Sequence, residues 1–520
     1  MSRHNGTDGR IDLLVVGAGA KATALAAKVH ALNTIGAGPL ALTIVEATEV
    51  AASWLGRNGM TSGEEPLAIP PIKDVGFPYQ SSNAFGALGA ELDRAMMPFT
   101  WQQYMIGKGE YARWVNAGSP AVQHRDYGRY LTWVLAQTTA GVTIVRGRVT
   151  QVSLPEQGGR WTVEVMEPSA HAGTDGNRPA PSEREVTPDR AAPRSSEPVG
   201  RRRYECNALV LTGPGVHRAL PHDPEAAARI FQCDSRRGEL ARIPPERSCD
   251  IAIVGGGESA LSAVAFLRDF RPAARMTVYT PMLPLSRGES FLENRVFSNP
   301  DEVAWSALDL QTRRDFVKHC DRGVFDPGTL ASIAYDERCR FLTGRVMHVG
   351  SHTERDGRGG VPGDSESGDS GVYVDYASAG GPTSTRHDYL INCTGFDLLE
   401  QLRGLFSPAL RAEIERQAGP VWDRPPEAEV AIGRALELQG MRPRLYIPGL
   451  AALNQGPGFA NLGCLGLLAN RVLAPLVLGE DAPGERPTVV ATSLQHPHTM
   501  ALLGEAQRAD AAAPGGSGSE

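Results

Sequence analysis

Two glycine-rich segments carry the residues whose types and spacing are best suited to chemistry. The first reads Gly17-Ala-Gly19-Ala-Lys-Ala22. In a dinucleotide-binding turn, Gly17 permits the tight bend, Gly19 lets the backbone approach a pyrophosphate, and Ala22 lets the following helix pack closely on a strand. Glu46 ends the next apolar run and would accept hydrogen bonds from ribose hydroxyls. The alternative interpretation is a tight turn that holds no ligand.

The same pattern recurs as Gly255-Gly-Gly257-Glu-Ser-Ala260. Two such turns in one chain suit a flavin enzyme, in which FAD occupies the first fold and an inserted second fold delivers a nicotinamide nucleotide. We therefore expect the first segment to bind FAD and the second to bind NADPH.

The elements that must position these turns follow from the apolar runs around them. Residues 11–16 and 251–254 lead directly into the glycine segments, and an apolar helical stretch follows each segment. The sequence thus predicts an α/β protein with two Rossmann-like dinucleotide-binding domains. The run at 388–397 reads as a strand ending in a Thr-Gly turn that returns the chain to the first domain. The FAD domain is therefore expected to be discontinuous, with the NADPH domain inserted in it.

The length of 520 residues also predicts several domains, because one hydrophobic core stops growing at roughly 250 to 300 residues. Residues 167–203 and 351–370 are polar and poor in large apolar side chains, which predicts a disordered insert and the tip of a hairpin. The FAD domain is predicted in two parts, 11–245 and 387–480, with the NADPH domain at 246–386 between them. The NADPH domain contains a small, mainly helical substrate-binding segment at 287–330, and a disordered tail is predicted at 505–520.

Charge and cysteine usage narrow the class of partner. The net charge of −7 removes the usual electrostatic argument for nucleic acid or an anionic membrane. Seven cysteines show neither a Cys-x-x-Cys pair nor the spacing of a zinc site, and His496 and His498 are assigned no role, so we expect no metal. The polar N-terminus and the lack of a long apolar run predict a cytoplasmic protein without a membrane span.

Further motifs add a family to this interpretation. They are GAGAKA at 17–22, IPPIKDVGFPYQS at 69–81, FTWQQYM at 99–105, YGRYLTWV at 127–134, GGGESA at 255–260, RGESFLENRVFSNP at 287–300, DRGVFDP at 321–327 and NQGPGFANLGCLGLL at 454–468. Together they resemble the bacterial N-hydroxylating flavin monooxygenases, most closely the mycobactin- and nocobactin-type L-lysine N6-monooxygenases. The glycine motifs occur in many flavoproteins, whereas the Lys-Asp and Phe-x-x-Asn-x-x-Phe elements are more specific.

The resemblance implies roles for individual residues. Lys73 is expected to pair with the α-carboxylate of the substrate through a charge-assisted hydrogen bond, and Asn294 to hold the same amino-acid head group. The alternatives are a solvated surface lysine and a helix-capping asparagine. Trp54 and Gly458 are expected among the cofactor-binding residues.

Three positions depart from the family pattern. Asp321 stands where an asparagine is common, and could bind the α-ammonium of the substrate but would repel a carboxylate. Gly463 replaces a serine at a substrate-binding position, which removes a side-chain hydrogen bond. The arginine that often receives the 2′-phosphate of NADPH is absent, so Arg275 or Arg287 would have to substitute, and NADH is an alternative reductant.

The reaction implied by the resemblance transfers hydride from NADPH to FAD, adds O2 to give a flavin C4a-hydroperoxide, and hydroxylates L-lysine to N6-hydroxylysine. Only a neutral amine has a free lone pair. Deprotonating a lysine amine of pKa about 10.4 at pH 7 costs roughly 4.6 kcal/mol unless the site lowers that pKa. No residue is assigned as a general base.

The pathway implied by the resemblance is hydroxamate siderophore biosynthesis, with siderophore-assembly enzymes as partners, and we expect a homo-oligomer. Three rival functions remain at this stage. They are L-ornithine N5-monooxygenase, another flavin-dependent monooxygenase or NADPH oxidase, and a non-catalytic FAD-binding protein.

Overall fold

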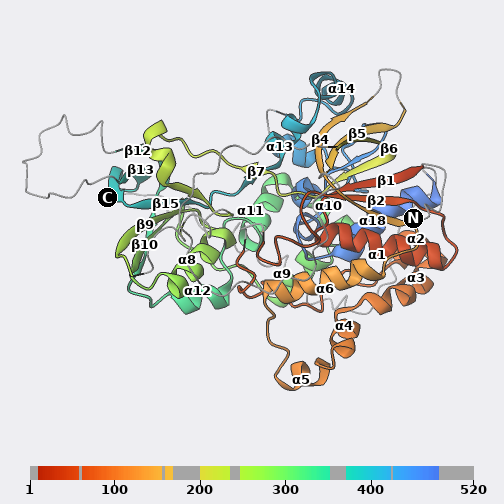
Figure 1. Cartoon of the computed structure of the whole chain (residues 1–520), viewed down its shortest axis with the longest axis horizontal. Coiled ribbons are helices and arrows are strands. Elements are labelled where there is room, and N and C mark those ends of the chain that lie inside the picture. Colours follow the sequence, from red (N-terminus) through yellow and green to blue (C-terminus); the bar gives the residue numbers. More distant parts are fainter. Residues whose placement is uncertain are drawn as a thin grey trace, which may run out of the picture.

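The computed structural model describes residues 10–57, 61–154, 159–167, 200–234, 240, 246–351, 371–422 and 425–479. Two lobes lie side by side (Figure 1). Both ends of the described chain build the first lobe, at the right of the view, and the middle of the chain builds the second, at the left. The predicted tail at 505–520 and residues 168–199 of the predicted insert lie outside the described residues.

The first lobe is built on a seven-stranded sheet. The central strand β1 (Ile11–Val16) is parallel to β2 (Leu42–Glu46) on one side and to β6 (Gly200–Leu211) on the other. Four of the six residues of β1 are fully buried, as expected of a parallel strand covered on both faces. The other strands of this sheet are β3 (Val142–Arg146), β4 (Arg148–Ser153), β5 (Trp161–Glu167) and β17 (Leu445–Tyr446).

Helix α1 (Ala20–Thr34) follows β1 and is buried on nearly every side. Its many alanines allow this, because small side chains let a helix lie close to the sheet and to a neighbouring helix at once. That neighbour is α18 (Leu465–Leu478), from the far end of the chain. The core of this lobe therefore joins the first and last parts of the sequence.

The second lobe holds a five-stranded, all-parallel sheet in the order β11–β10–β9–β15–β8. Helix α8 (Glu258–Phe270) follows β9 in the same strand–turn–helix arrangement as β1 and α1. The observed fold is α/β with two Rossmann-like units, as predicted. The strands are β8 (Ile230–Gln232), β9 (Cys249–Val254), β10 (Ala274–Thr280), β11 (Cys339–Thr343) and β15 (Tyr389–Asn392).

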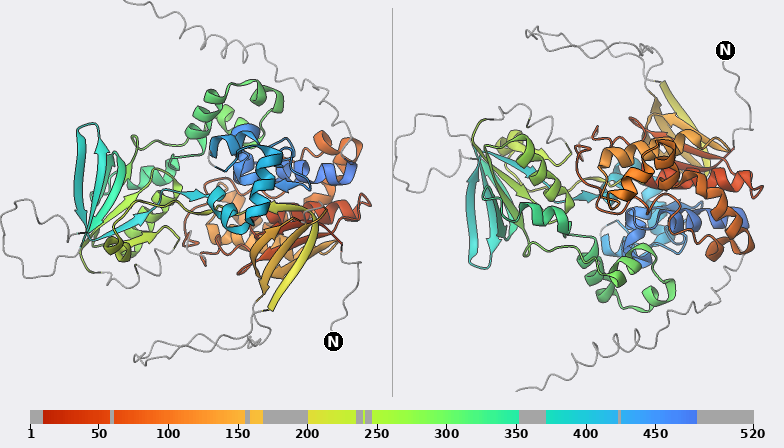
Figure 2. Two further views of the ribbon diagram at one scale, coloured as in Figure 1. Left: turned by 90° about the horizontal axis from the view of Figure 1, so that it is seen from above. Right: turned by 90° about the horizontal axis from the view of Figure 1, so that it is seen from below.

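A three-stranded antiparallel sheet lies at the outer end of the second lobe, where Figure 2 shows it edge-on. It contains β12 (Arg345–Ser351), β13 (Val372–Ser378) and β14 (Gly381–His387). The predicted pairing of β12 with β13 is confirmed, and the tip between them, at 352–370, lies outside the described residues.

Sheet pairing corrects three predicted boundaries. Strand β15 joins the second sheet beside β9 instead of returning to the first domain, and β8, assigned to the first domain, pairs with β15 in that same sheet. The second unit therefore begins before 246 and ends after 386. The predicted limits of the insert, 167–203, are also too wide, because Glu167 ends β5 and residues 200–203 begin β6. The charged run at 200–203 was assigned to a loop from its composition, but its backbone pairs with β5.

The segment predicted to bind substrate is helical, as expected. Its helices are α9 (Phe291–Ser298), α10 (Glu302–Ala307), α11 (Leu310–Cys320) and α12 (Pro327–Ile333). Trp305 and Val317 form a small core with Ala452 of the first lobe. Although this segment is part of the second unit in sequence, α9 to α11 thus pack on α16 and α17 of the first lobe, and Figure 2 shows these green helices beside the blue ones.

Two short strands join the lobes. β7 (Val216–His217) leaves the first lobe and β16 (Phe396–Asp397) returns to it, and the two are paired antiparallel. No helix among the described residues is long and apolar enough to cross a membrane. The remaining helices are α2 (Ser82–Phe85), α3 (Gly89–Met96), α4 (Trp101–Gly107), α5 (Tyr111–Asn116), α6 (His124–Gln137), α13 (Leu398–Leu405), α14 (Pro408–Ala418), α15 (Pro425–Val430), α16 (Ala452–Gln455) and α17 (Pro457–Ala460).

Candidate active site

The first glycine turn connects β1 to α1. Gly17 has a φ of +94°, and a Cβ there would lie 2.9 Å from the hydroxyl of Thr212, so only glycine fits without strain. A Cβ at Gly19 would meet no atom of the described residues within 4 Å, and no side chain among them caps α1. The N–H groups of a helix's first turn lack helical partners and attract anions. The open space in front of Gly19 therefore fits a pyrophosphate.

Glu46 lies beside this turn, at the end of β2. One carboxylate oxygen accepts from the backbone N–H of Ala18 at 2.7 Å, and the other accepts from the backbone and the hydroxyl of Thr48 at 2.8 and 2.9 Å. A carboxylate has about four acceptor positions, so capacity for a ribose hydroxyl is left. Ala22 is fully buried, as close helix packing requires.

Trp54 follows Ala51, whose backbone N–H donates to the carbonyl of Ala18 in this turn at 3.1 Å. Its ring packs edge-on against His124 and Tyr127, with ring centroids 5.1 and 5.4 Å away. Its cofactor contact stays a prediction. Taken together, the open helix terminus, the obligatory glycine and the terminal carboxylate fit FAD in the first lobe, which would supply the redox and oxygen chemistry when bound.

The second glycine turn connects β9 to α8 in the same way. Gly255 has a φ of +152°, and a Cβ there would lie 2.2 Å from the carbonyl oxygen of Cys393. Gly257 is the N-cap of α8, no side chain in the described part of the chain caps this helix, and Ala260 is fully buried. A Cβ at Gly257 would come to 3.8 Å from the backbone nitrogen of Gly323, so the loop containing Gly323 passes across this turn.

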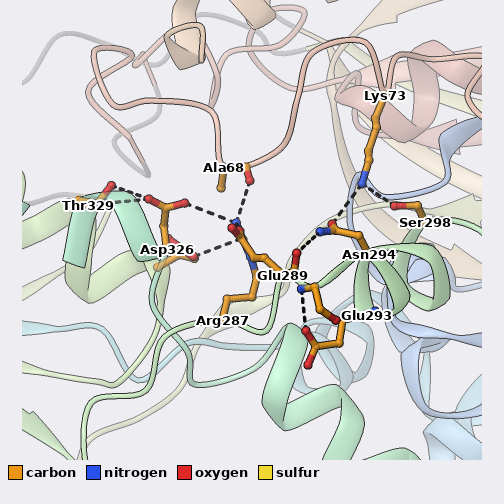
Figure 3. A network of polar contacts seen from close by, with 11 residues as sticks. Ala68, Lys73, Arg287, Glu289, Glu293, Asn294, Ser298, Asp326 and Thr329 are labelled. Carbon is orange, nitrogen blue, oxygen red and sulfur yellow. Dashed lines mark hydrogen bonds and ion pairs between the residues drawn. The ribbon is translucent and has the colours of Figure 1, made fainter. Parts of the chain in front are cut away.

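Lys73 and Asn294 meet between the lobes although 221 positions separate them in sequence (Figure 3). The Nζ of Lys73 lies 3.5 Å from the Oδ1 of Asn294 and donates to the hydroxyl of Ser298 at 2.6 Å. Both residues line a cavity of about 320 Å³, which also has Phe297 and Cys320 on its wall. Burial lowers the pKa of Lys73, and the nearby guanidinium of Arg287 lowers it further.

Arg287 lines the same cavity but is already occupied (Figure 3). It donates to the carbonyl of Ala68 at 2.8 Å and to the carboxylate of Glu289 at 3.0 Å, and lies 3.4 Å from the carboxylate of Asp326. Only 14% of its side chain is exposed. To bind the 2′-phosphate of NADPH, it would have to exchange carboxylate partners, so that role stays a prediction.

The structure excludes the other proposed substitute. Arg275 pairs with Asp250 at 2.8 Å, and both residues lie at the beginning of their strands, whereas the second glycine turn follows the end of β9. Ligands of a parallel sheet bind at the carboxyl ends of its strands. Arg275 is therefore at the wrong edge to contact a nucleotide held by Gly257.

Asp321 does not line the cavity with Lys73 and Asn294. Its Oδ1 accepts from the side-chain amide of Asn461 at 2.8 Å, and burial raises its pKa. The positive charge of Lys21, from the first glycine motif, opposes this rise in the pKa of Asp321. Burial lowers the pKa of Lys21 itself to about 8. Asp321 thus faces the first lobe, and its contact with the α-ammonium of the substrate stays a prediction.

Gly458 and Gly463 both pack against Phe297, one against its backbone and the other against its ring. A Cβ at Gly463 would lie 2.6 Å from the ring of Phe297, and a Cβ at Gly458 would lie 2.0 Å from the carbonyl oxygen of Phe297. The replacement of serine by Gly463 therefore has a packing reason, since the ring occupies the space that a side chain would need.

Three residues of the site were not singled out from the sequence. Ser298 follows Asn294 by four positions on α9, so helical spacing alone could have placed both on one face. Glu289 and Asp326 had no comparable signal, because their approach to Arg287 depends on how two distant loops meet.

Comparison with known proteins decides the family. No family model matches the chain. The chain is 34% identical over 478 residues to the L-lysine N6-monooxygenase MbtG of Mycolicibacterium paratuberculosis, covering 91% of this chain and 97% of that protein. The chain belongs to the L-lysine N6-monooxygenase family. The MbtG protein of Mycobacterium tuberculosis strain H37Rv matches similarly, at 34% identity over 466 residues, 89% of this chain and 94% of that protein.

Solved structures agree with this family. The lysine monooxygenase NbtG of Nocardia farcinica superimposes with a TM-score of 0.67 at 31% identity, over 89% of this chain and 98% of that one. The ornithine N-hydroxylase KtzI of a Kutzneria species has a TM-score of 0.64 at 16% identity, over 90% and 99% of the two chains, and shows a shared fold.

Proposed function

We propose that this protein hydroxylates the side-chain amine of L-lysine to N6-hydroxylysine with FAD, NADPH and O2. One oxygen atom enters an N–H bond, the other leaves as water, and NADPH supplies the two electrons. Membership of the L-lysine N6-monooxygenase family supports this reaction. The observation that carries the substrate assignment is the cation–amide pair of Lys73 and Asn294 on one cavity wall.

In this proposal Lys73 and Asn294 anchor the substrate's head group. The ammonium of Lys73 and the amide of Asn294 can both donate to an α-carboxylate, and Ser298 fixes the direction of the Lys73 side chain. Half-buried Phe297 and buried Cys320 give the cavity apolar surface. An amine held against such surface is desolvated, which favours its neutral, nucleophilic form.

The cofactor assignments follow the two glycine turns. We assign FAD to the turn at Gly17 and Gly19, and NADPH to the turn at Gly255 and Gly257. The free state of all seven cysteines supports a cytoplasmic setting. Homo-oligomerisation and transfer of the product to siderophore-assembly enzymes complete the proposal.

The test compares three amines with purified enzyme, FAD and NADPH. Hydroxylated product and hydrogen peroxide are measured per NADPH consumed for L-lysine, L-ornithine and 1,5-diaminopentane. If the head group is anchored, ornithine falls short by one methylene, and a displacement of about 1 Å from the attack geometry costs about 100-fold in rate. We expect product with lysine and mainly peroxide with ornithine. Equal coupling with both amino acids would refute the length selection, and peroxide alone with all three amines would refute the hydroxylase.

A further inference from the structure

Three metal-ligating side chains of different type converge beside the cavity. They are Glu293 on α9, and His319 and Cys320 at the end of α11. One ligand atom from each, a carboxylate oxygen, an imidazole nitrogen and the thiol sulfur, lies within 4.8 Å of the other two. This is the one such group among the described residues.

One carboxylate oxygen of Glu293 is fixed by the start of its own helix. Its Oε2 accepts from the backbone N–H of Ser290 at 2.7 Å, completing a capping box at the start of α9. Its Oε1 lies 2.5 Å from the Nε2 of His319. The carboxylate therefore has one fixed oxygen and presents the other to the cluster.

The exposure of the remaining two ligands differs. The His319 side chain is 54% exposed, so a metal ion could enter from solvent. Cys320 is buried and forms part of the cavity wall. The cluster thus spans the wall between solvent and the substrate cavity.

Gly288 supplies a second observation. It is not among the residues with positive φ, so no turn requires glycine there. A Cβ on Gly288 would instead lie 2.3 Å from the Nε2 of His319 and 2.7 Å from the Oε1 of Glu293. Glycine at this position leaves room for the imidazole and carboxylate to meet, and its N–H donates to the carbonyl of His319 at 3.0 Å.

We propose that Glu293, His319 and Cys320 form a binding site for Zn²⁺ at the wall of the substrate cavity. Zinc is bound in proteins by this mixture of oxygen, nitrogen and thiolate ligands, at about 2.0 to 2.3 Å in tetrahedral geometry. The short contact between Glu293 and His319 would open slightly to admit the ion, and the Cys320 thiol would give up its proton to solvent. Three protein ligands leave one position for water.

The site is tested by metal binding to the FAD-loaded enzyme without a histidine tag, in the absence of NADPH and lysine. Its result is therefore independent of the hydroxylation proposed above. Co²⁺ serves as the spectroscopic probe, because tetrahedral cobalt absorbs in the red, beyond the flavin bands. Zn²⁺ affinity is measured by competition with a chromophoric chelator.

The variants are Cys320→Ser and His319→Gln, with His348→Gln as the matched control. His348 also faces a carboxylate, that of Asp223 at 3.2 Å, but no thiol completes a cluster there. We expect one Zn²⁺ per chain, affinity at least about tenfold weaker in Cys320→Ser and His319→Gln, and no change in His348→Gln. Equal affinity in wild type and Cys320→Ser would overturn the site.

The wild-type cobalt spectrum needs no variant to fold. Intense tetrahedral bands support the site. Their absence at saturating Co²⁺ would leave Glu293 and His319 as a plain ion pair and refute the proposal.

Discussion

Replacing Lys73 by methionine should separate recognition of the head group from chemistry at the amine. Methionine keeps an unbranched apolar side chain but removes the ammonium, which donates to Ser298 at 2.6 Å and lies 3.5 Å from Asn294. Loss of a charged hydrogen bond costs about 1.5 to 3 kcal/mol, or roughly 10- to 150-fold in binding. We expect kcat/KM for lysine to fall by that factor, mainly through KM.

The assay for Lys73→Met uses a second substrate as an internal control. 1,5-Diaminopentane has the reach of lysine but no carboxylate, so its kcat/KM should not change in the variant. Lys108→Met is the matched control, since Lys108 is a partly exposed lysine paired with Glu110 at 2.8 Å, outside the cavity. An equal loss for lysine and the diamine would show that Lys73 supports the structure instead of anchoring a carboxylate, and an unchanged KM for lysine would remove it from the site.

The remaining predictions concern the glycines and one buried lysine. Gly19→Val should abolish FAD binding, measured as flavin content, and a normal FAD content would refute the assignment of FAD to this turn. Gly257→Val should bind FAD normally, but NADPH should reduce the bound flavin slowly while dithionite reduces it at the normal rate. Gly463→Ser should displace Phe297, raising the KM for lysine and lowering Tm, because a Cβ would lie 2.6 Å from that ring; unchanged values would refute the packing argument. Burial lowers the pKa of Lys28 from 10.5 to about 8, so the unfolded chain binds more protons between these values and wild-type stability rises with pH across that window. The variant Lys28→Met lacks this rise. In urea unfolding, the free energy of unfolding of the wild type should therefore increase by about 3 kcal/mol relative to that of the variant between pH 8 and 10.5. A difference that stays constant with pH would contradict the lowered pKa of Lys28.

Local sequence patterns predicted the two turns because they need only neighbouring residues. Gly17 and Gly255 sit between an apolar strand and an apolar helix, and strand, turn and helix are each specified within a few positions. The pairing of Lys73 with Asn294 came from family resemblance, since no periodicity links residues so far apart. Strand β15 was assigned to the wrong sheet because a short buried run does not specify which sheet it joins.

Polar contacts between loops were the least predictable part of the site. Arg287 was named as a possible substitute for the phosphate-binding arginine, and the sequence did not indicate that Glu289 and Asp326 pair with it. Asp321 was predicted to bind substrate, and the sequence did not indicate that its carboxylate accepts a hydrogen bond from Asn461 of the first lobe. Both contacts join residues that are brought together only by tertiary packing, in which α10 and α11 pack on the first lobe around Trp305.

The antiparallel pairing of β7 with β16 places the two chain crossings between the lobes side by side, so the second lobe can be deleted at one point. The chain leaves and re-enters the first lobe through strands whose backbones are only about 5 Å apart, so closing that gap with a short turn costs little loop entropy. Among the described residues between Leu211 and Leu398, none belongs to the hydrophobic core of the first lobe. A shortened chain without residues 218–395 should therefore retain its own core and the flavin turn, while losing the cavity wall that carries Asn294. This one internal deletion should therefore separate FAD binding from amine hydroxylation. A foreign domain could be inserted at the β7–β16 pair in place of the second lobe.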